Sequence, residues 1–471
     1  KDLGGGGLSC VVGELALDAG FGAKVDLEKV HLKVENMPPW EIWVSESQER
    51  MMFTVTPKNV NKVLEICKSW DVEAVSIGEV IAEKRNIVNY HGIEILNLDL
   101  EFTTGGPVYK RPYNLPEYNI GNPTDLPPYP DDMKAQIINI INQPEVASKD
   151  WVIRQYDHEV RGKTTLKPIQ GPIGKEVPGD SSVIKPVDDS WKGLALTSDV
   201  NPYLMEANPY HGTMSAVEEV CRNLASVGAR IDSLADCLCF GNPRRPDIMG
   251  QFKASCEALR DAAVAVDVPY VSGNVSLYNE TQEGAIPPTP VLMGIGLVND
   301  IRKCVTSDMK SEGSIWLVGQ TKEEMGASLY YRTLGIECPK VPTTNFKTFL
   351  PRMEQLIQAI ESEEVVACHD ISNGGLALSI IEMCMSGFGA EITFDDKLRA
   401  DIELFSESNG RWIVQVAPGC EDTFSKRFDF AKKIGNINEK IIFKNGTEKL
   451  VELTIEEVRD KWTKPIWERL A

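Results

Sequence analysis

The sequence predicts a protein of mixed helices and strands in which one unit occurs twice. The stretch "DLGGGGLSCVVGELALDAGFGA" at 2–23 parallels "DISNGGLALSIIEMCMSGFGA" at 370–390. Further along each copy, "VSESQERMMF" at 44–53 parallels "LFSESNGRWI" at 404–413. The length of 471 residues is too great for a single hydrophobic core, so roughly two to four domains are expected.

Each copy begins with an aspartate and glycines that lead into a predicted helix. Apolar residues recur on one helical face in both copies: Leu8, Val12, Leu15 and Ala19 in the first, and Leu376, Ile380 and Met383 in the second. Glycines before a helix let the backbone approach a ligand, and the first N–H groups of the helix favour anions. A tight loop-to-helix turn without a ligand is the structural alternative.

The second pair of matching segments keeps the same order and nearly the same spacing. Asp2 aligns with Asp370 (370 − 2 = 368), and Glu46 aligns with Glu407 (407 − 46 = 361), so the copies differ in length by seven residues. We expect each Ser-Glu-Ser phrase to begin a strand. The copies then diverge, because Gln48 in the first is replaced by Asn409 in the second.

A segment of another kind precedes the second copy. From about residue 165 it shows strand-like "SSVIKPV", a helix opened by "NPYHG", and strand-like "VPYVSGNVS" and "PVLMGIGLV". Asp370 therefore lies 370 − 165 = 205 residues inside its unit, whereas Asp2 stands at the start of this chain. The repeat predicts that a comparable opening part of the first unit is missing. The proline-rich stretch between the units predicts a linker or wrapped extended segment, with a short helix around 132–142.

Composition excludes several classes of function. The net charge is 49 − 69 = −20, which makes nucleic acid a poor partner. No run of 18 apolar residues predicts a membrane span, and no GxxxxGK[ST] predicts a P-loop kinase. Eleven scattered cysteines without a CxxC, and five histidines without a ligand-like cluster, indicate reduced thiols and a cytoplasmic location.

Six motifs in order, "DLGGGGLS", "SESQER", "NPYHG", "DCLCFGNP", "VSGNVSLYNE" and "HDISNGGLA", resemble the PurL family. These are the synthetase subunits of phosphoribosylformylglycinamidine (FGAM) synthase, in the small glutaminase-free form, within the PurM-like ATP-binding superfamily. The resemblance covers essentially the whole chain, as the C-terminal two-thirds of such a protein. It implies an α+β fold of duplicated PurM-like units, each with a central β-barrel-like half and an outer α/β half.

The resemblance also implies domain boundaries. The outer half of the first unit is expected at 1–105 and the proline-rich linker at 106–164. The central half of the second unit is expected at 165–304 and its outer half at 305–471. The first central half is then the part that is missing from this chain.

The implied reaction joins ammonia to formylglycinamide ribonucleotide (FGAR). ATP, with Mg²⁺, activates the amide oxygen as a phosphoryl imidate, and the products are FGAM, ADP and phosphate. Without a glutaminase nucleophile in this sequence, ammonia is expected from separate PurQ and PurS partners. The catalytic histidines of the family, in a Ser-His-Asn-His type stretch, are expected in the missing N-terminal portion, so this chain alone is expected to be inactive.

The resemblance assigns site residues by position. Metal ligands are Asp2 and Asn274, nucleotide contacts are Asp236 and Gly273, and substrate contacts are Glu46, Ser47, Gln48 and Ser276. Carboxylate and amide oxygens suit Mg²⁺. The structural alternatives are a helix N-cap for Asp2, exposed strand residues for 46–48, and a strand-ending turn for "SGNVS".

Some positions depart from the family pattern. Four glycines at 4–7 replace the usual Gly-Ala-Ala-Gly, and Cys239 stands where Asn is common. The second copy is expected to frame a second cleft, where Asp199 and Asp370 are either Mg²⁺ ligands or internally satisfied aspartates. His369 is interpreted as a structural or second-site residue.

Two other functions remain open. Another PurM-like enzyme, such as aminoimidazole ribonucleotide synthetase, would carry one unit rather than two. A non-catalytic nucleotide-binding scaffold would carry both.

Overall fold

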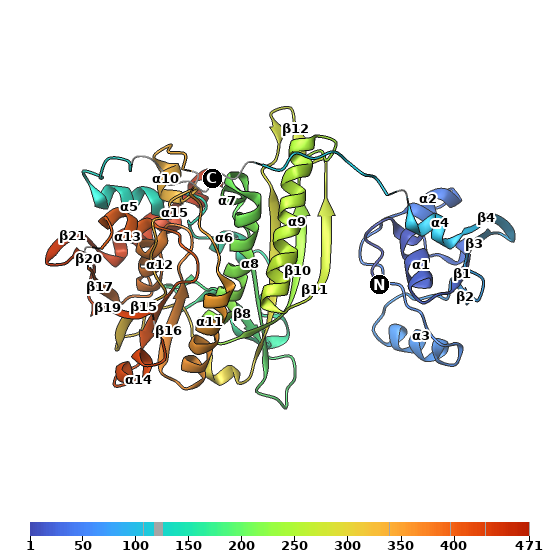
Figure 1. Ribbon diagram of the computed structural model, residues 1–471. Coiled ribbons are helices and arrows are strands. Elements are labelled where there is room, and N and C mark those ends of the chain that lie inside the picture. The colour runs from blue at the N-terminus through green and yellow to red at the C-terminus, as the bar shows by residue number, and fades with distance from the viewer. Residues whose placement is uncertain (107, 117–125, 339, 396, 429, 471) are drawn as a thin grey trace. The chain divides into compact units, whose positions relative to one another are not determined.

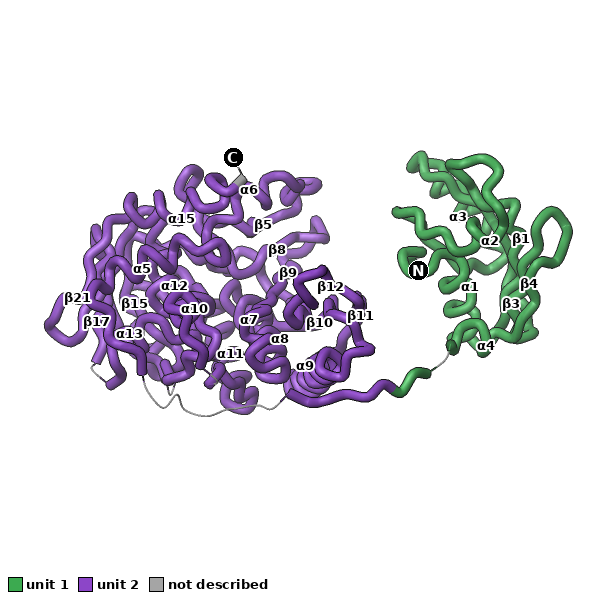
Figure 2. Tube along the Cα trace, turned by 90° about the horizontal axis from the view of Figure 1, so that it is seen from above, with its two compact units in different colours: residues 1–110 green, residues 111–471 purple. Residues whose placement is uncertain are grey.

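The computed structural model describes residues 1–106, 108–116, 126–338, 340–395, 397–428 and 430–470. The chain forms two compact units, Lys1–Lys110 and Arg111–Ala471 (Figures 1 and 2). Each unit has a hydrophobic core of its own, and the larger unit has two. Among the described residues, no helix is long and apolar enough to cross a membrane.

The first unit is a four-stranded sheet with helices packed beside it. Its elements are α1 (Gly7–Asp18), β1 (Gly22–Asp26), α2 (Pro39–Val44), α3 (Val60–Ser69), β2 (Gly78–Ile81), β3 (Arg85–Tyr90), β4 (Ile93–Asp99) and α4 (Leu100–Gly105). The strand order is β2-β1-β3-β4, with β1 antiparallel to β2 and parallel to β3. The predicted stripe of α1 is buried at Leu8 and Val12, but Ala19 lies beyond the helix end and is exposed.

The first part of the second unit is a six-stranded sheet, which we call the central sheet. Its strands are β5 (Thr164–Leu166), β8 (Ser182–Ile184), β9 (Gly193–Asp199), β10 (Arg230–Cys239), β11 (Tyr270–Ser276) and β14 (Thr289–Val298), in the order β11-β10-β14-β9-β8-β5. Helices α7 (Pro202–Ala207), α8 (Pro209–Ser226) and α9 (Pro246–Val266) accompany it (Figure 1). Helix α8 is the helix that "NPYHG" opens, and its residues Val217, Val220 and Leu224 are fully buried. A side chain at Gly294 of β14 would lie 2.3 Å from Val220, so glycine lets helix and sheet pack closely.

The rest of the second unit is a seven-stranded sheet, which we call the outer sheet. Its strands are β15 (Ser314–Val318), β16 (Val365–Asp370), β17 (Gly389–Phe394), β18 (Trp412–Val416), β19 (Ala431–Asn438), β20 (Ile441–Asn445) and β21 (Glu448–Leu453), in the order β16-β18-β15-β19-β17-β20-β21. Its helices are α10 (Leu329–Thr333), α11 (Phe346–Glu361), α12 (Gly375–Cys384), α13 (Ala400–Phe405), α14 (Glu421–Ser425) and α15 (Ile455–Leu470). Two short ribbons, β6 (Ile169–Gln170) with β7 (Val177–Pro178) and β12 (Glu280–Thr281) with β13 (Gly284–Ala285), complete the strands of the described chain.

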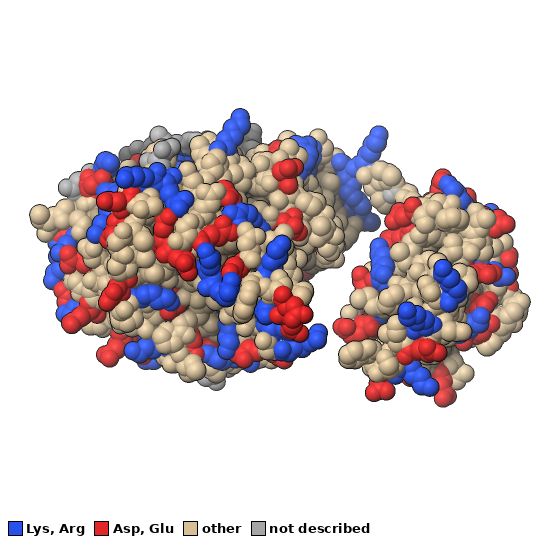
Figure 3. Space-filling model, turned by 90° about the horizontal axis from the view of Figure 1, so that it is seen from below, with Lys and Arg blue, Asp and Glu red and all other residues tan. Residues whose placement is uncertain are grey.

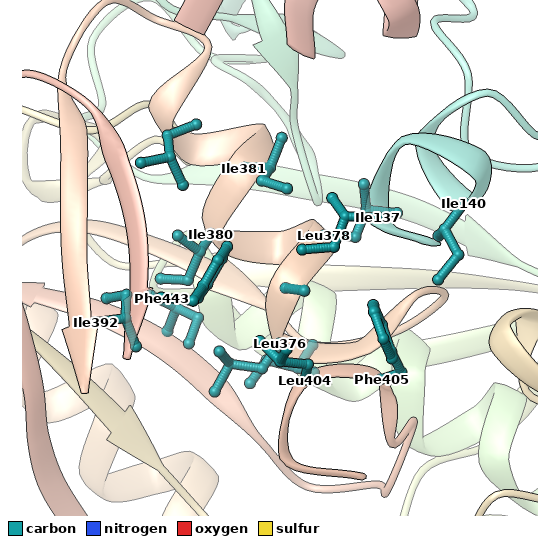
Figure 4. Close-up of a cluster of buried hydrophobic side chains, with 14 of the residues drawn as sticks. Ile137, Ile140, Leu376, Leu378, Ile380, Ile381, Ile392, Leu404, Phe405 and Phe443 are labelled. Carbon is teal, nitrogen blue, oxygen red and sulfur yellow. The ribbon is translucent and has the colours of Figure 1, made fainter. Parts of the chain in front are cut away.

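Helix α12 lies at the centre of one of the two hydrophobic cores of the second unit, beside the outer sheet. Leu376, Leu378, Ile380 and Ile381 point to several sides of the helix and are all buried (Figure 4). A helix that is apolar all round requires cover on all sides. Part of that cover comes from α5 (Met133–Ile141), which carries the buried Ile137.

Helix α5 lies within the proline-rich segment and matches the short helix predicted around 132–142. The side chain of Asp132 caps it by accepting a hydrogen bond from the N–H of Ala135 at 2.9 Å. This end of the segment is therefore part of a folded core, and the short helix α6 (Asp150–Ile153) follows it. Residues 107 and 117–125 of the same segment lie outside the described residues.

One strand pattern occurs in both units. In the outer sheet β17 is antiparallel to β19 and parallel to β20, and β20 is antiparallel to β21. In the first unit β1, β2, β3 and β4 have the same order and directions. The register also agrees: Lys24, two residues after Gly22, pairs with Ile87, and Glu391, two residues after Gly389, pairs with Ile442.

Charged side chains are mixed over the surface. Figure 3 shows acidic and basic groups interspersed on the visible face of each unit. With a net charge of −20, such a surface offers no basic patch for a phosphate backbone on that face.

Candidate functional site

Two loops of the first unit lie against each other, one at residues 2–7 and the other at 45–50. The backbone N–H of Leu3 donates to the carbonyl of Arg50 at 3.1 Å, and the N–H of Gly6 donates to Glu46 Oε1 at 2.7 Å. Gly7 has a φ of 59°, and a Cβ there would lie 2.1 Å from the carbonyl oxygen of Ser45. Only glycine allows this approach.

The predicted polar residues of this unit are exposed on the two loops. Asp2 Oδ1 accepts a hydrogen bond from the N–H of Gly4 at 2.9 Å. The N-cap of α1 is Gly6, and no side chain caps that helix. The alternative interpretation of Asp2 as the helix N-cap is therefore wrong. Ser47 Oγ lies 3.1 Å from Ser45 Oγ, and Gln48 Nε2 donates weakly to the carbonyl of Glu46 at 3.5 Å.

The expectation of a strand at the Ser-Glu-Ser phrase is also wrong. Residues 45–50 form a loop after α2, and Glu49 has a φ of 63°. The guanidinium of Arg50 folds this loop by donating to the carbonyls of Ser45 and Ser47, the latter at 3.2 Å. The polar residues 45–50 thus form a loop that is closed by its own arginine.

The corresponding loops of the second unit make the same contacts. The N–H of Ile371 donates to the carbonyl of Arg411 at 3.1 Å, and the N–H of Gly374 donates to Glu407 Oε1 at 2.8 Å. Arg411 donates to the carbonyls of Ser408 at 2.8 Å and Ser406 at 2.5 Å. Gly410, at the position of Glu49, has a φ of 73°.

The two copies differ in burial. Glu46 is exposed, whereas Glu407 is partly buried and also accepts a hydrogen bond from the N–H of Leu329 at 2.8 Å. Burial raises the pKa of Glu407 to about 7. Asn409, in place of Gln48, donates to Ser215 and Thr344 at 2.7 and 2.8 Å, so its amide is used within the fold.

Four predicted residues of the second unit lie on the neighbouring parallel strands β10 and β11. Asp236 pairs with Gly273, and a Cβ at Gly273 would lie 3.0 Å from Asp236 Oδ2. Burial raises the pKa of the half-buried Asp236. Asn274 and Ser276 alternate onto the other face of β11, and Asn274 is exposed.

Strand β11 is an edge strand of the central sheet, so both of its faces carry accessible groups. Asn274 Nδ2 donates to Cys237 Sγ at 3.4 Å. Ser276 Oγ lies 3.3 Å from Asn279 Oδ1, and Asn279 Nδ2 donates to the carbonyl of Ser276 at 2.9 Å. The "SGNVS" stretch is therefore a strand, and the turn follows it at Asn279.

Sequence reasoning missed a buried ionic network around Arg222. This arginine of α8 contacts Glu218, Glu219 at 3.0 Å and Asp370 Oδ2 at 3.1 Å. Burial raises the pKa of Asp199 and of Glu218 to about 7, against the opposing effect of Arg222. The signal was present in "EEVCRN", where charged residues stand on an otherwise apolar helix.

A second part of the network surrounds His369. Its Nδ1 lies 2.6 Å from Asp180 Oδ1 and its Nε2 lies 3.1 Å from Glu382 Oε2. Burial opposes protonation of this imidazole, but Asp180 and Glu382 together raise its pKa well above the ordinary value. Among the described residues, Asp180, His369 and Asp370 are the one group of three that could hold a metal ion. Because Arg222 and His369 already neutralise these carboxylates, an ion-pair network accounts for Asp370.

Two protein-family models together match most of the chain. The AIR synthase related protein, C-terminal domain, matches residues 1–91 and again 340–443, and the N-terminal domain of that family matches residues 178–298. The duplicate match covers the two segments whose strand order and loop contacts agree.

Curated relatives are subunits of one enzyme. The chain is 36% identical over 472 residues to phosphoribosylformylglycinamidine synthase subunit PurL of Thermoplasma volcanium, covering 98% of this chain and 61% of the relative. It is 38% identical over 468 residues to the same subunit of Thermococcus sibiricus, covering 98% and 63%. The chain therefore spans a little over three-fifths of the length of these relatives.

Solved structures with the same fold come from Thermotoga maritima. They are PurLQS (TM-score 0.66, 24% identity), PurL complexed with FGAR (0.63, 24%) and PurL complexed with ATP (0.62, 23%). Each match covers 93% of this chain and 63%, 61% and 63% of the respective solved chain. The chain belongs to the AIR synthase related protein family, and the curated relatives to which it is similar are PurL subunits.

Proposed function

We propose that the protein containing this chain is the synthetase subunit of FGAM synthase. It converts FGAR, ATP and ammonia to FGAM, ADP and phosphate. The observation that carries this proposal is the match to PurL subunits over 98% of the chain, at 36% and 38% identity. The T. maritima PurL structures with ATP and with FGAR support the choice of nucleotide and substrate.

The chemistry proceeds by activation of an amide oxygen. The amide oxygen of FGAR attacks the γ-phosphorus of ATP, the bond to ADP breaks, and a phosphoryl imidate forms. Ammonia then attacks the imidate carbon, and phosphate leaves with the former amide oxygen as the amidine forms. The protein contributes alignment of donor and acceptor and stabilisation of charge.

Each of the two units, taken by itself, offers an exposed oxygen donor of the kind that Mg²⁺ prefers. Asp2 offers a carboxylate and Asn274 an amide oxygen, the hard donors that Mg²⁺ prefers, and both side chains are exposed. Magnesium would neutralise phosphate charge when bound. Gly273 leaves backbone open beside Asp236, as a nucleotide contact requires. Glu46, Ser47, Gln48 and Ser276 would bind FGAR through hydroxyl, amide and carboxylate groups.

The paired loops and the repeated strand pattern support a duplicated PurM-like unit. The outer halves would be 1–105 and 305–471, the linker 106–164, and the second central half 165–304. In the outer sheet, strands β15 and β16 lie beside β18; β15 precedes Asp370 in the chain and β16 ends at it. In the first unit the residues corresponding to β18 are exposed at Met51 and Phe53 (67% and 69%). Strands from a preceding segment, which would include the first central half and the histidine loop, would cover them.

The proposed partners follow from the same relatives. PurLQS of T. maritima has the same fold over 93% of this chain, which supports a glutaminase subunit PurQ and a small subunit PurS as sources of ammonia. A cytoplasmic location is part of the proposal. Because the chain spans 61–63% of the relatives, the isolated 471 residues are expected to bind nucleotide without turnover.

The test is FGAR-dependent ATP hydrolysis with ammonium by the full-length protein. The wild type should hydrolyse ATP faster when FGAR is added. The Glu46→Ala, Gln48→Ala variant should lose this dependence and still bind ATP, because its nucleotide contacts lie on β10 and β11. A full-length protein that binds ATP but ignores FGAR would instead be a nucleotide-binding scaffold.

A further inference from the structure

Two cysteines lie side by side on the central sheet next to the proposed metal ligand Asn274. Cys237 and Cys239 are two residues apart on β10, so their side chains project from the same face of the sheet. Their sulfur atoms are 3.7 Å apart, and both side chains are partly accessible. On the neighbouring strand β11, Cys237 pairs with Asn274 and Cys239 with Ser276.

This face differs from the one that packs on helices. Leu238, between the two cysteines, points the other way and is buried, as is Leu292 opposite Asp236. On the cysteine face, Met293 and Leu297 of β14 are exposed (37% and 48%), so no helix covers it within the described residues. The two thiols thus stand on an open sheet face beside the exposed Asn274.

The spacing of the sulfur atoms matches a shared tetrahedral ion. Two thiolates bound to one tetrahedral Zn²⁺ at about 2.3 Å each are about 3.75 Å apart. The observed 3.7 Å needs no rearrangement of either side chain. A disulfide would instead require Cβ atoms about 3.8 Å apart, whereas residues two apart on a strand are separated by about 6.6 Å along the backbone. The geometry favours a bridging ion over oxidation to a disulfide.

We propose that Cys237 and Cys239 form a binding site for a thiophilic divalent cation such as Zn²⁺ or Cd²⁺. Soft thiolate ligands select such ions over Mg²⁺. Among the described residues, no histidine, carboxylate or third cysteine forms a three-ligand group with this pair. The other coordination positions are taken by water, so the ion is exchangeable rather than structural.

An occupied site has a consequence for the reaction, and this part rests on the proposed function. Asn274 Nδ2 lies 3.4 Å from Cys237 Sγ. A soft ion at the cysteines therefore stands within reach of the amide that is proposed to hold Mg²⁺. Binding of the soft ion lowers the rate of FGAR-dependent ATP hydrolysis by displacing or repelling Mg²⁺.

The test uses Cd²⁺ alone with the 471-residue chain, kept reduced, and follows the ultraviolet thiolate-to-cadmium absorption band. The wild type should bind one Cd²⁺ in a saturable step that EDTA reverses. Cys237→Ser, Cys239→Ser and Cys239→Asn should each weaken this step by roughly tenfold or more, since one of two thiolates is lost. Cys67→Ser and Cys420→Ser, which remove partly accessible single thiols, should leave it unchanged.

The controls separate the site from general thiol chemistry. Circular dichroism identifies any variant that fails to fold, and Cys239→Asn gives a second route if serine is not tolerated at that position. An equal Cd²⁺ step in the variants of Cys237 and Cys239 would overturn the site. If Zn²⁺ still inhibits the full-length Cys239→Asn enzyme, the proposed effect on Mg²⁺ at Asn274 is wrong, while the cation site itself is not overturned. The Cd²⁺ result does not depend on whether FGAR is the substrate, because the binding step contains no substrate. The Zn²⁺ inhibition result does rest on the proposed function.

Discussion

Glu46 Oε1 lies 2.7 Å from the backbone nitrogen of Gly6 and holds the glycine loop against the loop that carries Ser47 and Gln48. Glu407 makes the same contact with Gly374 at 2.8 Å. The first copy leaves Glu46, Ser47 and Gln48 exposed, whereas the second copy buries Ser406 and Ser408 and partly buries Glu407 and Asn409. The same local architecture thus presents exposed polar groups in one unit and groups used within the fold in the other.

The partly buried Glu407 should make stability depend on pH. Its folded pKa of about 7 lies above its ordinary value of 4.5, so its contribution to stability is full below pH 4.5 and is lost as the pH rises through 7. The loss is on the order of 3 kcal/mol. Urea unfolding at pH 5 and pH 8 should show that Glu407→Gln removes this component. The exposed Glu456→Gln is the control, and an equal pH response in both variants would contradict the assignment.

The glycine loop should tolerate alanine at one position and not at another. At Gly7 a Cβ would lie 2.1 Å from the Ser45 carbonyl and φ is 59°, so Gly7→Ala should destabilise the first unit by roughly 2 kcal/mol or more. At Gly5 a Cβ would meet nothing within 4 Å, so Gly5→Ala should change stability by about 0.5 kcal/mol or less. If the denaturation curves of the two variants coincide, the two loops are not packed as described.

Replacement by lysine should lower the free energy of unfolding more at Arg411 than at Arg50. Arg411 is fully buried and donates to Ser406, Ser408 and Thr321, so Arg411→Lys should cost about 2–4 kcal/mol of unfolding free energy. Burial lowers the pKa of Arg411 to about 10, which reflects the same desolvation. The half-buried Arg50 makes two such contacts, and Arg50→Lys should cost about 1 kcal/mol or less. A larger effect at Arg50 than at Arg411 would refute this ranking.

Nucleotide binding should depend on the absence of a side chain at Gly273. An alanine Cβ would lie 3.0 Å from Asp236 Oδ2 and would force the carboxylate to move. Gly273→Ala should weaken ATP binding by about tenfold in isothermal titration. Gly105→Ala, where a Cβ would have open space, should bind ATP like the wild type. Unchanged affinity in Gly273→Ala would remove β11 from the nucleotide site.

Local patterns predicted a large part of the fold. The glycine-to-helix turn at Gly7, the buried stripe with Leu8 and Val12 and the strand at "PVLMGIGLV" all follow from short-range patterns. Residues 45–50 were misassigned because apolar residues suited to a strand follow them. The arginine that closes the loop acts on carbonyl groups, which no side-chain pattern reveals.

Long-range contacts limited the prediction of the site. Asp180 meets His369 across 189 positions, and Arg222 meets Asp370 across 148. The charged residues of "EEVCRN" gave a local signal, but neither pairing of distant residues has a sequence signature, so the partners could be recognised only in the fold. The sulfur pair of Cys237 and Cys239 was visible as the closest pair of cysteines, but its meaning depended on the sheet face that it occupies.

The proposed activation of the amide oxygen can be followed with an oxygen label. The full-length protein would be given FGAR that carries ¹⁸O in its amide carbonyl, together with ATP, Mg²⁺ and ammonium. Mass spectrometry of the inorganic phosphate should find one ¹⁸O for each FGAM formed, because that oxygen leaves with the phosphoryl group. Unlabelled phosphate, with ¹⁸O released to water or retained in the organic product, would contradict the account.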